Sequence, residues 1–313
     1  MFENVQRIMM WTGAITLILS LGSTVHAAVT GPYTADANTL FLYHLDETSG
    51  ALVNDGAKGT GFNLTNTGGA TGRDGAGSGG YGATAYTGFG NAFDAYGSGD
   101  GTFHSGTASD GGGAHTESVT QSQADYQAAG GAFTYEALIK TPDLGPTAEH
   151  QIISRDNGTT SSRGFIFYIV NGDLTFFNGG ASVVSAAIPT TGGDAFVANE
   201  WFHVAISYTG NEGVADNVSF YWTRVVESAT AANLIGNATL TADANAATTD
   251  LFIGATGRDS YRREISMIDE VRISDVVRGA NDFIFAPASV PTPAAGSAGL
   301  VLLSVVAMRR RSH

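Results

Sequence analysis

The chain has 313 residues with 29 acidic against 15 basic side chains, a formal net charge of −14. Such a charge repels nucleic acid and anionic lipid headgroups and attracts cations, so we expect no nucleic-acid partner. The absence of cysteine excludes a disulfide framework, a thiol nucleophile and a thiolate metal site. Forty-two glycines among abundant Thr, Ser, Asn and Ala are typical of an exported β-rich protein with many turns.

The N-terminus, residues 1–27, has the pattern of a secretory signal peptide. Arg7 precedes an apolar stretch from Ile8 to Leu21, and Val25-His26-Ala27 supplies small residues for cleavage. An uncleaved N-terminal anchor is the alternative. The pattern predicts export to the cell envelope, the cell surface or the medium, with a mature body over residues 28–289.

Strand patterns recur along this body, and long runs of helical periodicity are absent from it. Asn171-Gly172 between two of the strands is a hairpin turn signal. Irregular spacing without an internal repeat counts against a propeller or solenoid. The predicted strands are Leu40–Leu45, Phe133–Lys140, Gln151–Ser154, Gly164–Val170, Asp173–Phe177, Trp201–Tyr208, Val218–Trp222, Asp250–Gly254 and Ile265–Ile273.

Residues 68–113 form a glycine-rich segment, with 17 glycines among 46 residues. Glycine side chains bury nothing, so we expect long loops around one short strand, Phe89–Phe93. The alternative is a calcium-binding glycine/aspartate repeat, to which Gly97–Gly101 comes near.

Alternation divides two later strands into faces. In Trp201–Tyr208, the set Phe202, Val204, Ile206 and Tyr208 is expected in the core. In Met267–Ile273, alternation places Asp269 in the apolar stripe, where a carboxylate is unfavourable unless it is paired or binds a cation.

The C-terminus, residues 290–313, has an apolar run Ala294–Met308 stopped by Arg309–Arg311. The run is shorter than the ~20 residues of a full membrane span. With Val290-Pro291-Thr292-Pro293 before it, the segment resembles the PEP-CTERM sorting tail of bacterial surface proteins, although Thr292 replaces the usual Glu. This resemblance implies transient membrane contact before processing; a simple tail anchor is the alternative.

Seven segments in order resemble the concanavalin A-like lectin/glucanase fold in its laminin G-like form. The resemblance covers nearly all of residues 40–285 and implies an all-β jelly-roll sandwich of two antiparallel sheets, one of them concave. The segments are LFLYHLDETSGALVNDGAKG (40–59), FGNAFDAYG (89–97), FTYEALIKT (133–141), HQIISRDNG (150–158) with GFIFYIVNGDLTFF (164–177), EWFHVAISYTG (200–210), DLFIGATG (250–257) and ISMIDEVRISDVVRG (265–279).

Catalytic motifs are missing from the sequence. The paired-carboxylate strand motif of glucanases is absent, as are the Arg/Gln-His/Tyr set of polysaccharide lyases, a nucleophile elbow and a zinc motif. We therefore expect a protein without enzymatic activity.

Calcium is the expected cofactor, in a structural role. Asp46 and Asp55 flank a Ser-Gly turn, and the resemblance brings the first and last strands together, which would place Asp269 beside them. The alternative is that the two N-terminal aspartates serve turns and that Asp269 pairs with Arg258 or Arg272.

Sugar binding needs aromatic platforms with polar partners. The candidate ligand-binding residues are Tyr81, Tyr86, Tyr96, His104, Arg155, Asn157 and Trp222. For each of them, ordinary packing or a solvated loop is the alternative.

The leading hypothesis is a surface-associated lectin-like domain that binds a polysaccharide or an extracellular matrix polymer. A structural or adhesive protein that contacts other proteins is the first alternative, and a divergent polysaccharide hydrolase or lyase is the second. A concave sheet lined by aromatics and amides would favour carbohydrate binding, and a filled concave face would favour the structural role.

Overall fold

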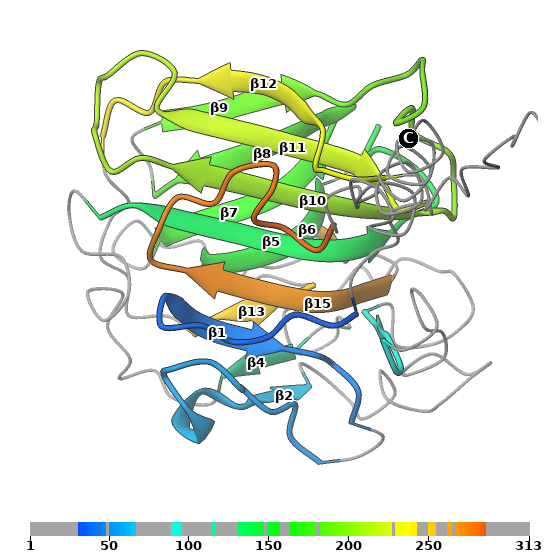
Figure 1. The fold of residues 1–313 in the computed structure, drawn as a ribbon, viewed down its shortest axis with the longest axis vertical. Helices are drawn as coiled ribbons and strands as arrows, with labels where there is room; N and C mark the ends of the chain where they lie inside the picture. The colour runs from blue at the N-terminus through cyan, green and yellow to red at the C-terminus, as the bar shows by residue number, and fades with distance from the viewer. Residues whose placement is uncertain are drawn as a thin grey trace, which may run out of the picture.

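The computed structural model is a sandwich of two β-sheets packed face to face (Figure 1). The predicted signal peptide, most of the glycine-rich segment and the sorting tail lie outside the residues it describes. Those are residues 31–47, 50–66, 89–95, 114–116, 131–146, 149–156, 163–179, 182–226, 229–242, 250–254, 262–264 and 267–285.

The front sheet, nearest the viewer in Figure 1, joins strands from both ends of the described chain. β15, the last strand in the sequence, lies between the first strand and the centre of the sheet. It is antiparallel to the strands on either side of it. In spatial order it consists of β1 (Thr39–Tyr43), β15 (Met267–Ser274), β5 (Phe133–Lys140), β10 (Trp201–Tyr208), β11 (Val218–Arg224) and β12 (Leu234–Ala238), with β3 (Phe93–Asp94) beside β15.

The back sheet is antiparallel along its whole path; only β14 (Arg262–Glu264) joins β6 in parallel. Within the described residues, the helical element is one short 3-10 turn, Thr60–Phe62. The spatial order of the back sheet is β2 (Leu64–Asn66), β4 (Ala114–Thr116), β13 (Phe252–Ile253), β6 (Glu149–Asp156), β7 (Arg163–Val170), β8 (Asp173–Asn178) and β9 (Ser182–Ala187).

The all-β prediction is confirmed, and so are the strands with strong alternation. The predicted ranges Phe133–Lys140 and Trp201–Tyr208 coincide with β5 and β10. Asn171 and Gly172 form the predicted hairpin turn with φ values of 53° and 84°, a conformation that Asn and Gly adopt readily. The prediction of a strand over Phe89–Phe93 is largely wrong, because only Phe93 and Asp94 pair with β15.

The core between the sheets is rich in aromatic rings. Ring centroids of Phe133, Tyr135 and Phe165 lie 4.6 Å from their neighbours in a stacked row. The predicted inner face of β10 is confirmed, since all four of its side chains are buried in the core: Phe202, Val204, Ile206 and Tyr208.

Alternation alone gave the wrong face for Asp269. A β-bulge lies between the pairs Asp269↔Leu138 and Arg272↔Glu136, and Glu270 has a φ of 49°. The extra residue shifts the alternation, so Asp269 shares the register of the outward-facing Leu138. The residues of β15 that face the core are Ile268, Val271 and Ile273.

Two segments of the chain, one before β1 and one after β15, lie over the outer face of the front sheet. Residues 275–285, which we call the C-terminal strap, cross in front of β5 and β10 as the orange segment after β15 in Figure 1. Tyr33 joins the strap in a second apolar cluster on this face. No helix in the described part of the chain is long and apolar enough to cross a membrane.

Candidate functional site

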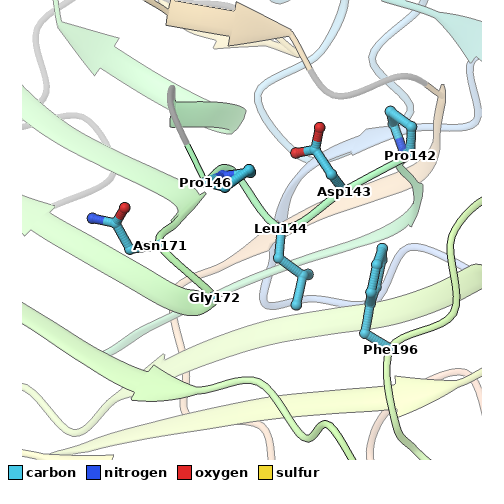
Figure 2. A pocket seen from close by; sticks show the side chains of 7 residues that line it. All are labelled: Pro142, Asp143, Leu144, Pro146, Asn171, Gly172 and Phe196. Carbon is cyan, nitrogen blue, oxygen red and sulfur yellow. The ribbon is translucent and has the colours of Figure 1, made fainter.

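Three loops next to one another form a pocket of about 490 Å³, which we call the loop pocket (Figure 2). They are the β5–β6 loop, the β7–β8 turn and the β9–β10 connection. The volume lies within the range of about 300–1,000 Å³ common for small-molecule sites. The pocket is lined by Pro142, Asp143, Leu144, Pro146, Asn171, Gly172 and Phe196.

Backbone hydrogen bonds hold these loops together. The amide of Asn171 donates to the carbonyl of Gly145, and the amide of Gly172 donates to the carbonyl of Leu144, each at 2.9 Å. The carbonyl of Gly172 in turn accepts from the amide of Ile188, also at 2.9 Å. The wall of the pocket is therefore formed before any ligand arrives.

The Asp143 carboxylate is fixed in its orientation. Its Oδ1 accepts from the amide of Gly145 at 2.8 Å and from Nε2 of His150 at 2.6 Å. His150 is fully buried on β6, whereas the Asp143 side chain is 34% exposed. Because a carboxylate only accepts hydrogen bonds, the buried histidine donates through Nε2 and fixes a negative group in the lining of the pocket.

Phe196 supplies the aromatic wall. Its ring is half-buried, and its centroid lies 6.0 Å from Phe202 and 6.5 Å from Trp222. Nε1 of Trp222 donates to the carbonyl of Asp194 at 3.1 Å and anchors the connection that carries Phe196. The core thus supports an aromatic face toward the pocket, the geometry on which a sugar ring can stack.

Two of the predicted sugar-contact residues are buried. Trp222 is fully buried in the core, so ordinary packing, the alternative to sugar contact, accounts for its position. Arg155 is 2% exposed on β6, opposite Phe165. The other five candidates lie outside the described residues: Tyr81, Tyr86, Tyr96, His104 and Asn157.

The three predicted metal ligands make separate contacts. Oδ1 of Asp46 accepts from the amide of Asn91 at 2.6 Å, and Oδ1 of Asp269 accepts from the amide of Glu270 at 2.8 Å. Asp55 lies 3.7 Å from Nε2 of His44. The described residues contain no group of three or more His, Asp or Glu side chains arranged to hold a metal ion.

The first and last strands do meet, as expected, but Glu270 makes the contact between them in place of Asp269. The bulge on β15 brings Glu270 to His44, with Oε1 2.7 Å from Nδ1. This hydrogen bond raises the pKa of His44, and burial raises the pKa of Glu270. The alternative pairing of Asp269 with Arg272 is also not seen, because Arg272 binds Glu136.

A buried polar network occupies the outer face of the front sheet. Nε of Arg272 donates to Oε1 of Glu136 at 2.5 Å, and Nε2 of His203 lies 3.3 Å from Oε2 of the same carboxylate. The hydroxyl of Tyr33 also donates to Glu136, and the Arg272 guanidinium lies 3.9 Å from the Tyr33 ring centroid. Burial raises the pKa of Glu136, but Arg272 and His203 outweigh it and hold that pKa below its ordinary value.

The C-terminal strap seals this network. The ring centroid of Phe283 lies 4.8 Å from His203 and that of Phe285 lies 5.3 Å from it. Nη2 of Arg272 donates to the carbonyl of Asp282 at 3.1 Å. The outer face of the front sheet is thus filled by the protein's own chain.

The family follows from a match over residues 110–282, which runs from β4 through β15 into the strap. The matching family model is described as the concanavalin A-like lectin/glucanases superfamily and covers more than half of the chain. The chain belongs to this superfamily. The matched range excludes β1, which pairs with β15 at the edge of the front sheet.

Several solved structures are similar to this chain at low sequence identity. A Trypanosoma rangeli sialidase is 11% identical with a TM-score of 0.47; the match covers 82% of this chain and 35% of the sialidase. Botulinum neurotoxin type C and the serotype D binding domain are 14% and 12% identical, with TM-scores of 0.47 and 0.46. Each covers 78% of this chain, which spans about half of either toxin chain. The comparison with curated proteins found no match.

Sequence reasoning missed the residues of the loop pocket. Asp143, Asn171 and Phe196 lie in three different loops, and only the fold brings them together. The available signal was the Pro142-Asp143-Leu144-Gly145-Pro146 run after a strand, which marks a structured loop with an acid at its centre.

Proposed function

We propose that this protein is a non-catalytic, lectin-like domain that binds a polysaccharide or extracellular matrix polymer through the loop pocket. The observation that carries the proposal is the combination of a half-buried ring, Phe196, with a fixed and partly exposed carboxylate, Asp143, in one preformed pocket. Both groups belong to loops, where binding residues commonly occur on a rigid scaffold.

The chemistry of sugar recognition fits this pair. A pyranose ring stacks its apolar face on an aromatic side chain, while its hydroxyl groups donate to fixed acceptors. In the loop pocket, Phe196 would contact the ring face and Asp143 would accept from a hydroxyl. Asn171, exposed at the turn, adds an amide that both donates and accepts.

Affinity electrophoresis of the full chain through a panel of soluble polysaccharides tests this role. We expect retardation by at least one polymer without shortening of its chains. Phe196→Leu keeps apolar bulk but removes the aromatic face, and it should weaken retardation at least several-fold. Asp216→Asn, in the exposed β10–β11 loop, is the control and should leave retardation unchanged. Shortened polymer would point to the hydrolase or lyase alternative.

A structural or adhesive role is the second candidate, because the filled outer face of the front sheet favours it. The strap and Tyr33 pack over β5 and β10, so in the described part of the chain this area of the face is occupied by the protein's own side chains. Failure of every polysaccharide to retard the chain, together with cross-linking to surface proteins of the source cells, would favour this candidate.

We further propose that the chain is exported and sorted to the cell surface through a signal peptide at residues 1–27 and a PEP-CTERM-type tail at residues 290–313. The support is the sequence pattern at each end. Mass spectrometry of the protein from its own cells should find a mature N-terminus near Ala28 and loss of the tail. Retention of both segments would contradict sorting.

Structural calcium stays a prediction. Its support is the acidic character of the chain and the carboxylates of Asp46 and Asp55 on adjoining N-terminal loops. A ligand that binds only the folded state raises stability, so calcium should raise the melting temperature relative to a chelator. An unchanged melting temperature would refute a structural calcium ion.

A further inference from the structure

We infer that two copies of this chain pair through the outer edge of β9, which joins their back sheets into one continuous sheet. A strand at the edge of a sheet carries backbone N–H and C=O groups on a side where the sheet has no further strand. The edges of this sandwich are β1 and β12 in the front sheet and β2 and β9 in the back sheet.

The edges formed by β1 and β2 are covered by the chain itself. The amide of Leu42 on β1 donates to Oδ1 of Asn54 at 3.0 Å, and its carbonyl accepts from the amide of Asp55 at 2.9 Å. Beside β2, Leu52 and Leu64 exchange two backbone hydrogen bonds of 2.9 Å. The segment between β1 and β2 therefore satisfies both of these edges.

The edge formed by β12 is irregular. Its pairing with β11 shifts register between Phe220 and Tyr221, and such irregularities are one of the devices that protect an edge strand from a second chain. Gly236 in the middle of β12 also lies close to the back sheet, since a Cβ at this position would be 3.0 Å from the Cβ of Ala186.

Half of the backbone groups of β9 point away from β8. The amide of Ile188, one residue beyond β9, donates to the carbonyl of Gly172 at 2.9 Å, so these two residues form a hydrogen-bonded pair. Hydrogen-bonded and non-hydrogen-bonded pairs alternate along an antiparallel ladder. The N–H and C=O groups that point to the open side are therefore those of Val183, Ser185 and Ala187, and among the described residues they have no backbone partner.

β9 also lacks the features that protect an edge strand. Its sequence, SVVSAA, has no charged residue, proline or glycine, and its ladder with β8 runs over six residues without a register shift. Val183 is 58% exposed, and Ser185 and Ala187 are exposed as well. A regular and uncharged edge of this kind can accept another strand along its length.

A second copy of the chain fits this edge because the outward residues are arranged evenly about Ser185. Most homo-oligomers are two-fold symmetric, so their contact surface must be complementary to itself. Antiparallel pairing about such an axis places Ser185 opposite its own copy and Val183 opposite Ala187 of the partner subunit. Every outward N–H of β9 then meets an outward C=O.

The acidic character of the chain does not extend to this edge. Each chain has a net charge of −14, but β9 itself is uncharged. The acid in the neighbouring strand is Asp173, opposite Ala187, and its Oδ2 accepts from the hydroxyl of Ser185 at 3.2 Å. Because Asp173 lies one strand away from the edge, pairing brings no like charges directly opposite each other between the two β9 strands.

Sedimentation velocity of the full chain over a series of concentrations measures the pairing. One strand edge offers less contact area than the about 1,200–2,000 Å² of stable complexes, so we expect a dimer that dissociates on dilution. Moderate salt is used, because it screens the repulsion between two acidic chains.

Ser185→Pro removes the N–H at the centre of the contact. This N–H does not bond to β8, and proline is tolerated where the N–H of an edge strand faces outward, so the melting temperature should change little. The dissociation constant of the dimer should rise about tenfold or more, because two backbone hydrogen bonds are lost across the axis.

Ser185→Cys tests the register of the two strands in a chain that has no cysteine of its own. Residues of a hydrogen-bonded antiparallel pair have Cα atoms about 5.5 Å apart, within the about 4.4–6.8 Å of disulfides. Diamide, which takes up the two electrons and two protons of a thiol pair, should therefore link this variant into a covalent dimer. In the matched control Val183→Cys the two thiols lie about 14 Å apart along the paired strands and should not be linked.

Three results would overturn the inference. The first is a monomer at every concentration, and the second is a dimer whose dissociation constant is unchanged in Ser185→Pro, because its contact would then lie elsewhere on the chain. The third is equal linkage of Ser185→Cys and Val183→Cys, which indicates collision without a fixed register. If Ser185→Pro does not fold, as judged by circular dichroism, the two cysteine variants decide. Polysaccharide retardation is a separate measurement, so its failure would leave the pairing of β9 unaffected.

Discussion

Arg272 on β15 and Glu136 on β5 form an ion pair at 2.5 Å that is almost fully buried, with exposures of 5% and 0%. The pair joins the last strand of the sandwich to its central strand, opposite the aromatic core. It is possible only because the bulge at Asp269 and Glu270 returns Arg272 to the outer face, in register with Glu136.

Breaking this pair on one side should destabilise the fold strongly. Glu136→Gln leaves the Arg272 charge buried without its partner, so the free energy of unfolding should fall by about 3–5 kcal/mol. Chemical denaturation monitored by circular dichroism measures the change. The double variant Glu136→Met with Arg272→Leu should lose less than Arg272→Leu alone, because neither charge remains; a larger loss in the double variant would contradict this account.

Stability should fall on mild acidification through His203. Burial lowers the pKa of His203 and outweighs the raising effect of Glu136. The unfolded chain binds this proton below a pH of about 6.5 while the folded chain does not, so the contribution of His203 is present above that pH and is lost as pH falls. Denaturation midpoints across this range should decline toward acid, and His203→Gln should flatten the decline.

His44 should act in the opposite direction. Its pKa is raised by the hydrogen bond to Glu270, so its contribution to stability is complete below a pH of about 6.5 and is lost as pH rises through the raised pKa. His44→Asn should remove the loss on the alkaline side and leave the acid-side decline of His203 in place. If the pH profile of stability is the same in His44→Asn as in the unaltered protein, His44 does not contribute to the pH dependence.

The C-terminal strap should contribute to the stability of the fold in the way that a packed core element does. Phe283→Ala removes a buried ring from His203 and Tyr221, whose centroid distances to it are 4.8 and 5.0 Å, and should lower the free energy of unfolding by about 3–5 kcal/mol. Val277→Ala, at a strap position that is 47% exposed, is the control and should change stability by less than about 0.5 kcal/mol. Equal effects at the two positions would mean that the strap is not packed as described.

Gly56 should not tolerate a side chain. A Cβ at this position would lie 2.4 Å from the carbonyl oxygen of Leu40, a backbone atom that cannot turn aside. Gly56→Ala should therefore destabilise the fold by about 1–3 kcal/mol, as overpacking does. Gly61→Ala, where no atom lies within 4 Å of the new Cβ, should be nearly neutral. Thermal melts of the two variants measure the difference.

The short strands escaped prediction for a physical reason. β4 has only three residues and is held by β2 and β13 from distant parts of the chain, so its local sequence carries little periodicity. β13 falls inside the predicted range Asp250–Gly254, but only two of those residues form the strand. β12 (LIGNA) includes a glycine and an asparagine, which are poor strand formers, and its strand conformation comes from pairing with β11.

The sequence by itself determined the all-β class, the inward face of β10 and the Asn171-Gly172 turn, because each depends on local alternation or on the backbone preferences of one or two residues. Only the tertiary structure decided the rest. The bulge on β15 sent Asp269 outward and joined Glu270 to His44, the strap filled the front face, and three separate loops brought Asp143, Asn171 and Phe196 into one pocket. These features arise from contacts between residues far apart in the chain, which leave no periodic pattern in the sequence.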